Sequence, residues 1–351
     1  MSNPPKLRLL KGSSLSSLDI PPREPLLGDW LTERHPCMVY AQTGRGKSLF
    51  AMSVAIAVAG GGNVFGWSAT EPRPVLYVDG EMDVADAAER DTLLKPAVEG
   101  LDWEALEANR TILSRHYQLH GAVFPDLVDD AGQEVLMTLV EKLRPALVVL
   151  DNLSCLADIR DENDAASFTP VLNMMWRLRH AGCAVLLVHH TGKQEGKYRG
   201  SSKLSAVFES VLQLAPNPDL LTGDTGFTIK VDKYRSGGSP QPLKVSLEVD
   251  AATGAGYWQY EALGERRLQE VVQAVRSREF NTGKELAAHL GIATSTLSKL
   301  KRKAIAANLI TEAEWKQCLQ DARDTSREFD DPYGLDGYDD GDSGEEDNHA
   351  A

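Results

Sequence analysis

One short segment of the sequence combines the residue types and the spacing that bind a polyphosphate. Residues 41–48 read Ala-Gln-Thr-Gly-Arg-Gly-Lys-Ser, between an apolar run and a helical pattern. Gly44 and Gly46 let the backbone turn its N–H groups toward phosphate oxygens, and the helix adds its positive N-terminal end. Lys47 would place its charge over the β and γ phosphates, and the Ser48 hydroxyl would ligate Mg²⁺. The segment predicts a site for ATP and Mg²⁺ formed by Thr43, Gly44, Arg45, Gly46, Lys47 and Ser48.

An acidic residue that ends a buried strand can complete such a magnesium site. Asp151 follows the run Ala-Leu-Val-Val-Leu at 146–150, which is typical of a buried parallel strand. An aspartate at the carboxyl end of a strand can also be a mere cap. Beside a phosphate-binding loop, a direct or water-mediated role at the magnesium ion is the favoured interpretation.

A second acidic residue follows another predicted strand. Glu81 comes after the apolar run 75–78, the first strand expected after the phosphate-binding loop and its helix. That position would bring Glu81 beside the nucleotide, where its carboxylate would polarise the attacking water. A glutamate that interacts with the dipole of a helix N-terminus is the plainer alternative. We interpret Glu81 as the catalytic base.

Two pairs of polar residues follow later strands. His189 and His190 end the run 184–188, where a polar pair indicates a sensor of the γ phosphate, although an isolated histidine is usually structural. Lys233 and Arg235 follow a strand nearer the C-terminus. Such cations are commonly solvated edge residues. In a ring-forming ATPase they would instead reach the γ phosphate of a neighbouring subunit, where an arginine contributes about 10³ to 10⁵ in rate.

The elements that must position these residues form an alternating series between residues 26 and 262. Apolar strands separated by helices are typical of a parallel sheet covered on both faces, so we expect an α/β domain there. Residues 1–25 are rich in Pro, Ser and Leu without a sustained period, which predicts a flexible arm. The expected parallel strands are 37–40, 75–78, 146–150 and 184–188, and the expected antiparallel edge strands are 210–214, 227–231, 243–249 and 257–260.

The pattern beyond this domain is purely helical. Four apolar residues at i, i+3, i+4 and i+7 predict one buried helix face. Thr282 can cap a second helix that Gly291 ends, and a third helix is expected at about 294–308. This succession predicts a small all-α helix-turn-helix module over residues 265–316. The four apolar residues are Leu268, Val271, Val272 and Val275.

The third of these helices has two chemically different faces. Apolar residues occupy one face, and Ser295, Lys299 and Arg302 occupy the opposite face. The polar face would meet a major groove or phosphates, so we expect these three residues to bind duplex DNA. Modules of this kind also serve as protein docking units, which is the alternative.

The net charge of −14 is concentrated near the C-terminus. Residues 328–347 carry ten carboxylates and no Lys or Arg, and without those ten the chain has 41 acidic and 37 basic residues. Residues 265–311 carry nine Lys or Arg against four Glu, a net of +5. The tail at 325–351 cannot bury enough surface to fold alone, so we expect disorder. It would serve for solubility, dock a protein partner, or compete with DNA for the basic module.

The composition excludes several classes of protein. With 42% hydrophobic and 25% charged residues, the chain suits a globular protein and not a collagen-like or wholly disordered one. Its longest apolar stretch, at 50–62, is too short to cross a bilayer, and its N-terminus lacks a signal pattern. We therefore expect no membrane association and a cytoplasmic location. The four cysteines are widely spaced without a C-x-x-C pair, which disfavours a disulfide framework or a zinc site.

Seven motifs follow one another in the order A-Q-T-G-R-G-K-S, Y-V-D-G-E-M, V-V-L-D-N-L-S, D-E-N-D-A, L-L-V-H-H-T-G-K, R-G-S-S and K-Y-R. This order resembles the RecA-like ATPases of the RepA hexameric helicase group, found on plasmids and phages, and more loosely the DnaB helicase core. The resemblance covers roughly residues 28–262. Ala41 departs from it, because it stands at the first-glycine position and so requires a site without positive φ.

The resemblance implies a hexameric ring with ATP sites between subunits. It also assigns a role to each candidate residue. Carried over one by one, the nucleotide ligands are Lys47 and Ser48, the base is Glu81, the magnesium-site acid is Asp151, the sensor is His190, and the finger pair that acts in trans is Lys233 with Arg235.

The same resemblance points to residues 192–199 as a loop that faces the channel of the ring. The composition of the loop agrees with this, because Lys193, Lys197 and Arg199 supply charge for a nucleic-acid backbone and Tyr198 supplies a stacking face. An ordinary solvated loop is the alternative. We expect single-stranded DNA to be contacted here.

Two functions fit these observations. The first is an ATP-driven DNA motor, a replicative helicase of a plasmid or phage. The second is an ATP-gated DNA-binding protein, either a replication initiator or loader or a transcriptional regulator, without unwinding activity. The helix-turn-helix module favours the second more than a bare motor would need.

Overall fold

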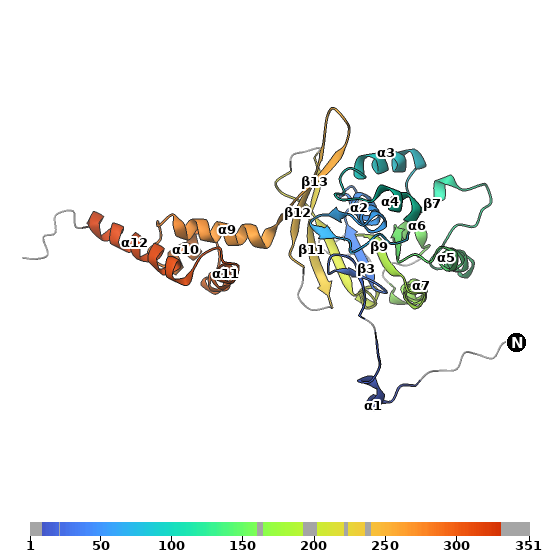
Figure 1. The fold of residues 1–351 in the computed structure, drawn as a ribbon, viewed down its shortest axis with the longest axis horizontal. Coiled ribbons are helices and arrows are strands. Elements are labelled where there is room, and N and C mark those ends of the chain that lie inside the picture. Colours follow the sequence, from blue (N-terminus) through green and yellow to red (C-terminus); the bar gives the residue numbers. More distant parts are fainter. Residues whose placement is uncertain are drawn as a thin grey trace, which may run out of the picture. The chain divides into compact units, whose positions relative to one another are not determined.

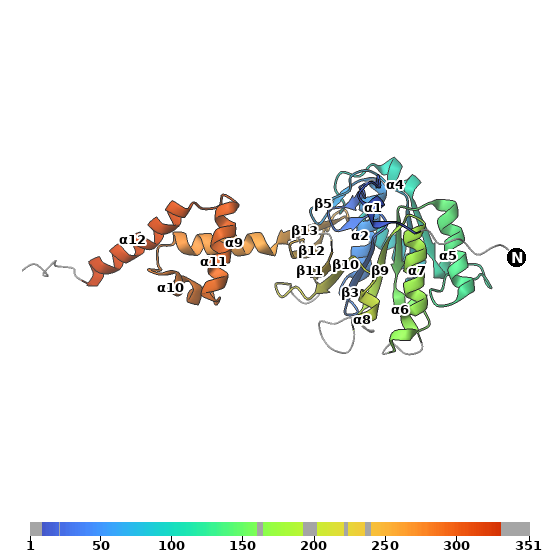
Figure 2. The ribbon, with the colours of Figure 1, turned by 90° about the horizontal axis from the view of Figure 1, so that it is seen from below.

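The computed structural model describes residues 9–20, 22–159, 164–191, 202–220, 224–235 and 240–330. The chain divides into two compact units, residues 1–262 and 263–351, each of which is described by itself. Figures 1 and 2 show the elements of both. Three predicted DNA-contact residues, Lys193, Lys197 and Arg199, lie outside the described residues.

A sheet of nine strands, counted over the described residues, forms the centre of the first unit. Its order is β13-β12-β11-β10-β3-β9-β8-β6-β7. The strands from β10 to β7 run parallel, and β11, β12 and β13 are antiparallel additions at one edge. The strands are β3 (Pro36–Ala41), β6 (Val75–Asp79), β7 (Arg110–Ser114), β8 (Leu147–Asp151), β9 (Ala184–His190), β10 (Ser210–Ala215), β11 (Thr225–Tyr234), β12 (Leu243–Val249) and β13 (Gly256–Ala262).

Helices cover both faces of this sheet (Figure 2). Val39 and Ala41 of β3 pack into the core on the α2 side, whereas Met38 and Tyr40 pack into the core that includes α7. Successive strand residues point to opposite faces, so a strand buried on both sides is apolar throughout. The expected α/β class is confirmed. The helices are α2 (Lys47–Gly60), α3 (Val84–Leu94), α4 (Trp103–Asn109), α5 (Asp130–Leu143), α6 (Leu153–Leu156), α7 (Thr169–His180) and α8 (Ser202–Ser205), with 3₁₀ turns at Arg115–Tyr117 and Ala165–Phe168.

Two strands differ from the sequence prediction. The strand expected at 210–214 as an antiparallel edge addition is β10, which pairs in parallel with β3 inside the sheet. The polar residue Gln213 interrupts the apolar run of β10, so the sequence does not indicate that this strand lies inside the sheet. Strand β7 was not predicted, because as an outer strand it leaves Thr111 and Ile112 exposed and lacks a continuous apolar run.

Aromatic side chains pack beneath α2 and tie distant segments to it. The Phe50 ring stacks on that of Phe65, with centroids 5.4 Å apart, and contacts Phe227 of β11 edge-on at 6.1 Å. Trp30 and Trp258 extend the cluster to the N-terminal segment and to β13. Each such pair adds about 0.5–1.5 kcal/mol beyond its area burial. The cluster fixes the helix that follows the phosphate-binding loop.

The N-terminal segment is partly described. Residues 9–20 contain the short helix α1 (Gly12–Leu15), within the segment 1–25 that the sequence predicts as a flexible arm. Several apolar side chains here are exposed, among them Leu9 and Ile20. Small two-stranded sheets follow, formed by β1 (Pro25–Leu27) with β2 (Leu31–Thr32) and by β4 (Asn63–Val64) with β5 (Trp67–Ser68).

The second unit is helical throughout its described residues. The predicted apolar residues of the first helix, Leu268, Val271, Val272 and Val275, are buried. Thr282 caps the second helix as predicted, since its Oγ1 accepts the Glu285 N–H at 3.2 Å. Gly291 has φ +62° in the turn before the third helix. The helices are α9 (Leu263–Arg276), α10 (Gly283–His289), α11 (Thr294–Ala306) and α12 (Glu312–Asp330).

Helix α12 corrects the expected disorder from residue 325, because it continues to Asp330. Trp315, Cys318 and Ala322 are buried along one face of the helix. These residues recur at i, i+3 and i+7, but acidic and polar neighbours obscure the pattern in the sequence. The remainder of the predicted tail, 331–351, lies outside the described residues. No helix among the described residues is long and apolar enough to span a membrane.

Candidate nucleotide-binding site

The phosphate-binding loop connects β3 to α2 at the carboxyl edge of the parallel strands. Ala41 is the last residue of β3 and pairs with His190 of β9, so this position is extended and needs no glycine. Gly44 and Gly46 have φ +76° and +78°, which favours glycine at both. A side chain at Gly46 would also place its Cβ 3.0 Å from the Phe227 ring. The loop therefore has the backbone that the sequence predicts.

Lys47 begins α2 and is held at the mouth of the loop. Its ammonium donates hydrogen bonds to the carbonyls of Ala41 at 3.2 Å and Gln42 at 3.0 Å. Only 6% of the residue is exposed. Burial lowers the pKa of Lys47, and the carboxylates of Asp151 and Glu81 raise it. An anionic phosphate in the loop would stabilise the buried positive charge further.

Asp151 ends β8 beside Ser48 and is buried. Tyr77 donates a hydrogen bond to its Oδ2 at 2.7 Å, and the Ser48 hydroxyl also bonds to it. Burial raises the pKa of Asp151 to about 6, these two hydrogen bonds lower it, and the Asp79 and Glu81 carboxylates raise it. A buried carboxylate beside a hydroxyl offers oxygen ligands, which Mg²⁺ prefers. These oxygen ligands therefore fit a magnesium ion, which Ser48 and Asp151 would hold.

Glu81 is oriented from two neighbouring strands. Asp79, the last residue of β6, accepts the N–H groups of Glu81 and Met82 at 3.0 and 2.9 Å and so turns the chain there. Asn152, next after β8, donates from its side-chain amide to the Glu81 carboxylate. The Asp151–Asn152 peptide bond is cis. The Glu81 side chain is thereby kept at the nucleotide cleft.

The two histidines at the end of β9 face different cavities. His190 Nδ1 lies 3.4 Å from Thr43 Oγ1, and His190 lines the cleft that contains the phosphate-binding loop. His189 is only 2% exposed and lines a separate cavity of about 320 Å³ with Arg115. Alternation along the strand separates them. The structure therefore places His190, and not His189, at the cleft of the phosphate-binding loop, and its role as a sensor stays a prediction.

The cleft around these groups has a volume of about 610 Å³, within the range of ligand pockets. A second side of this cleft is lined by residues that the sequence does not predict. Its residues come from α3 and from the ends of β11 and β12, and no short motif marks them. They are Asp86, Arg90, Leu93, Thr225, Leu247 and Val249.

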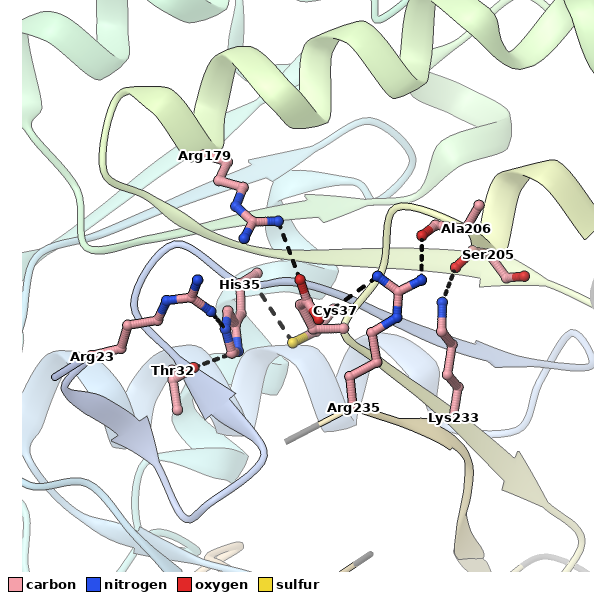
Figure 3. Close-up of polar contacts among 10 residues, drawn as sticks. Arg23, Thr32, His35, Cys37, Arg179, Ser205, Ala206, Lys233 and Arg235 are labelled. Atoms are coloured by element: carbon pink, nitrogen blue, oxygen red, sulfur yellow. Dashed lines mark hydrogen bonds and ion pairs between the residues drawn. The ribbon is translucent and has the colours of Figure 1, made fainter. Parts of the chain in front are cut away.

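The finger pair lies away from this cleft. Lys233 of β11 pairs with Val211 of β10, which pairs with Met38 of β3, whereas the loop begins after Ala41. Strands rise about 3.3 Å per residue, so Lys233 lies roughly 10 Å along the sheet from the residue at which the loop begins. Figure 3 shows the Lys233 and Arg235 side chains directed toward the carbonyls of Ser205 and Ala206. The pair is thus at the amino edge, opposite its own nucleotide cleft.

The predicted duplex-contact residues belong to the second unit. Ser295, Lys299 and Arg302 are exposed on α11. Lys301, on another face of the same helix, instead pairs with Glu312 of α12 at 2.9 Å and lies over the Trp315 ring. The predicted face of α11 is thus exposed, and its contact with DNA stays a prediction.

The fold and this cleft define a P-loop nucleotide-binding protein with an α/β core. Residues 3–196, more than half of the chain, match the protein family described as the AAA domain, so the protein belongs to this family. It is accordingly an AAA-type ATPase.

The fold is also similar to a solved KaiC-like protein from the hyperthermophilic archaeon Pyrococcus horikoshii. The two are 16% identical with a TM-score of 0.45, and the similarity covers 67% of this chain and 96% of that one. Comparison with curated proteins gave no match.

Proposed function

We propose that the protein is an ATP-driven motor that moves along single-stranded DNA as a ring of identical subunits, a hexameric helicase of the plasmid and phage type. The observation that carries the proposal is the separation of Lys47 and Arg235 to opposite edges of one sheet. A complete hydrolytic site then needs the finger pair of a second subunit. Repeating this head-to-tail contact around an axis closes a ring.

Each residue of the cleft has a role in this proposal. The loop N–H groups and the Lys47 ammonium bind the β and γ phosphates. Ser48 and Asp151 would hold Mg²⁺, and the ion would supply positive charge beside the phosphate oxygens. Glu81 accepts a proton from the water whose oxygen attacks the γ phosphorus, while the bond to the leaving ADP oxygen breaks. His190 contacts the γ phosphate from the end of β9.

The DNA part of the proposal is supported by the sequence. The motif order resembles the RepA group, and residues 192–199 combine cations with Tyr198 as sequence-tolerant single-strand contacts do. Hydrolysis between subunits would drive the strand through the ring. Lys193, Lys197 and Arg199 would bind its phosphates.

A second function is favoured by one observation, the exposed Ser295, Lys299 and Arg302 face of α11 in a separate unit. A helix with such a face suits duplex DNA, which a translocating ring does not require. In this alternative the second unit binds a DNA site and ATP controls assembly there. The protein would then be an initiator, loader or regulator.

Displacement of a labelled strand from a forked duplex separates the two functions. The motor predicts displacement with ATP and Mg²⁺, none with a non-hydrolysable analogue, and none by a Lys47→Ala variant. An intact fork under conditions where the protein hydrolyses ATP and binds the duplex would refute the motor and support the ATP-gated alternative.

A further inference from the structure

The finger pair is held by acceptors that come from one short segment, the last residue of α8 and the turn that leads to β10 (Figure 3). The Lys233 ammonium donates to the Ser205 carbonyl at 2.6 Å, and the Arg235 guanidinium donates to the Ala206 carbonyl at 3.0 Å. The Glu209 carboxylate lies 3.9 Å from Arg235 Nη1 and adds a negative charge. We call these two carbonyls and this carboxylate the finger cradle.

Within the cradle, Glu209 lies between two guanidinium groups. Arg179 of α7 donates from Nη1 to Glu209 Oε1 at 3.2 Å, and Glu209 Oε2 faces Arg235. The Glu209 side chain is 13% exposed and that of Arg179 is 23% exposed, but that of Arg235 is 50% exposed. One carboxylate oxygen is therefore anchored inside the unit, and the other faces a cation that remains accessible to a second subunit.

The backbone of the cradle is fixed by the sheet. The Glu209 N–H donates to the Pro36 carbonyl at 2.9 Å, and the Arg235 N–H donates to the Glu209 carbonyl at 3.1 Å. Leu204 and Phe208, on either side of the segment that carries the two carbonyls, are fully buried. The finger cradle thus has a fixed backbone, and it holds the long side chains of Lys233 and Arg235 in place.

Three cationic side chains lie around the finger cradle, and the Glu209 carboxylate offsets their mutual repulsion. Burial lowers the pKa of Lys233, the Arg235 charge lowers it further, and Glu209 raises it. The negative charge of Glu209 thus offsets the mutual repulsion of Lys233, Arg235 and Arg179. An uncharged side chain at this position would leave the two guanidinium groups adjacent without a counter-charge.

We propose that Glu209 is a positioning residue for the finger pair: anchored by Arg179, its carboxylate sets the direction in which Arg235 is presented to the nucleotide of a neighbouring subunit. The proposal rests on the proposed function, since it requires Arg235 to act in trans. ATP binding takes place at the opposite edge of the sheet. Loss of the carboxylate would therefore slow the chemical step and leave ATP affinity unchanged.

The test compares Glu209→Gln with a matched control, Glu134→Gln, in the full-length protein. Glu134 also pairs with an arginine of α7, Arg177 at 2.5 Å, but lies outside the cradle. A displacement of about 1 Å can cost about 100-fold in rate, so we expect kcat for Glu209→Gln to fall about 10- to 100-fold with KM for ATP unchanged. Glu134→Gln should retain the wild-type kcat. An equal loss in both variants would overturn the proposal.

A double-mutant cycle shows whether Glu209 acts through Arg235. In an Arg235→Ala background, Glu209→Gln should change kcat by less than about twofold, because the group it positions is gone. Independent, multiplicative losses would show a general structural role and overturn the proposal. If Glu209→Gln fails to fold, Arg179→Gln, which removes the anchor, carries the same cycle with the same expected result.

Two failures are distinguishable. If Arg235→Ala lowers kcat but Glu209→Gln does not, the positioning role is wrong and the trans finger stands. If Arg235→Ala itself leaves kcat unchanged, the trans finger fails, and the role of Glu209 fails with it.

Discussion

The side-chain amide of Asn152 donates a hydrogen bond to the carboxylate of Glu81, which joins the ends of the adjacent strands β8 and β6 at the nucleotide cleft. The Asp79 carboxylate accepts the backbone N–H groups of Glu81 and Met82 and so fixes the turn that follows β6. Glu81 is therefore held by both neighbouring strands at the position where the attacking water would be polarised. This arrangement supports the role of a base that is oriented before ATP arrives.

Replacing Glu81 by glutamine keeps its size and its polar contacts but removes its basicity. We expect Glu81→Gln to bind ATP with wild-type affinity and to lower kcat by about 10² to 10⁴, the contribution of a general base. Nucleotide binding and phosphate release measured on the same preparation check this. Undiminished hydrolysis would remove Glu81 from the mechanism.

Replacing Asp151 by asparagine should raise the stability of the protein at high pH but abolish ATP hydrolysis. Burial raises the pKa of Asp151 to about 6, so the folded protein binds this proton more tightly than the unfolded chain does. Without metal, the free energy of unfolding therefore falls as pH rises from about 4 to 6 and stays lower above pH 6. The size of this loss is up to about 3 kcal/mol, from the shift between 3.8 and about 6.

At pH 8 without Mg²⁺, Asp151→Asn should thus be more resistant to denaturant than the wild type, and the difference should disappear near pH 4. The same variant should lose ATP hydrolysis, because the magnesium ligand is gone. Denaturant unfolding at the two pH values provides the check. Equal stability at pH 8 would show that the buried carboxylate carries no such cost.

Subunits with complementary defects should restore one another. Arg235→Ala leaves the nucleotide cleft intact, and Lys47→Ala leaves the finger pair intact, so a mixed ring contains some complete sites. We expect each variant alone to be nearly inactive and mixtures to recover part of the ATPase rate. No recovery at any ratio, in rings shown to be mixed, would contradict sharing of sites between neighbours.

Duplex binding should depend on the exposed face of α11. Lys299→Ala and Arg302→Ala should each weaken binding and make the slope of log K against log salt concentration shallower by about 0.9 for each DNA phosphate that the variant no longer neutralises. Lys316→Ala, an exposed cation on α12, is the matched control and should change neither. Titration of a labelled duplex at several salt concentrations measures both quantities. Equal effects of all three substitutions would indicate nonspecific charge only.

Much of the parallel core could be predicted from the sequence, because its strands are buried on both faces and are apolar throughout, as at 147–150 and 184–188. Strand β7 and helix α12 could not, because their exposed sides break the apolar pattern. The position of β10 in the sheet could not be predicted either, because a central strand differs from an edge strand in which strands pair with it, and no local pattern shows this.

The cleft shows a similar division. Lys47 and Ser48 belong to a contiguous motif, so the spacing of the motif alone predicts that they lie at the cleft. Arg90 and Val249 reach the same cleft from distant elements, and nothing local in the sequence links them to it. The choice between His189 and His190 likewise needed the structure, since it depends on which face of β9 each side chain occupies.

The most direct measurement is phosphate release from ATP by the purified protein with Mg²⁺, with and without single-stranded DNA, beside the Lys47→Ala variant. We predict that the wild type binds ATP and releases phosphate, faster when DNA is present, and that Lys47→Ala does neither. A wild-type protein that neither retains ATP nor releases phosphate, with or without DNA, would contradict the assignment of this cleft as a hydrolytic nucleotide site.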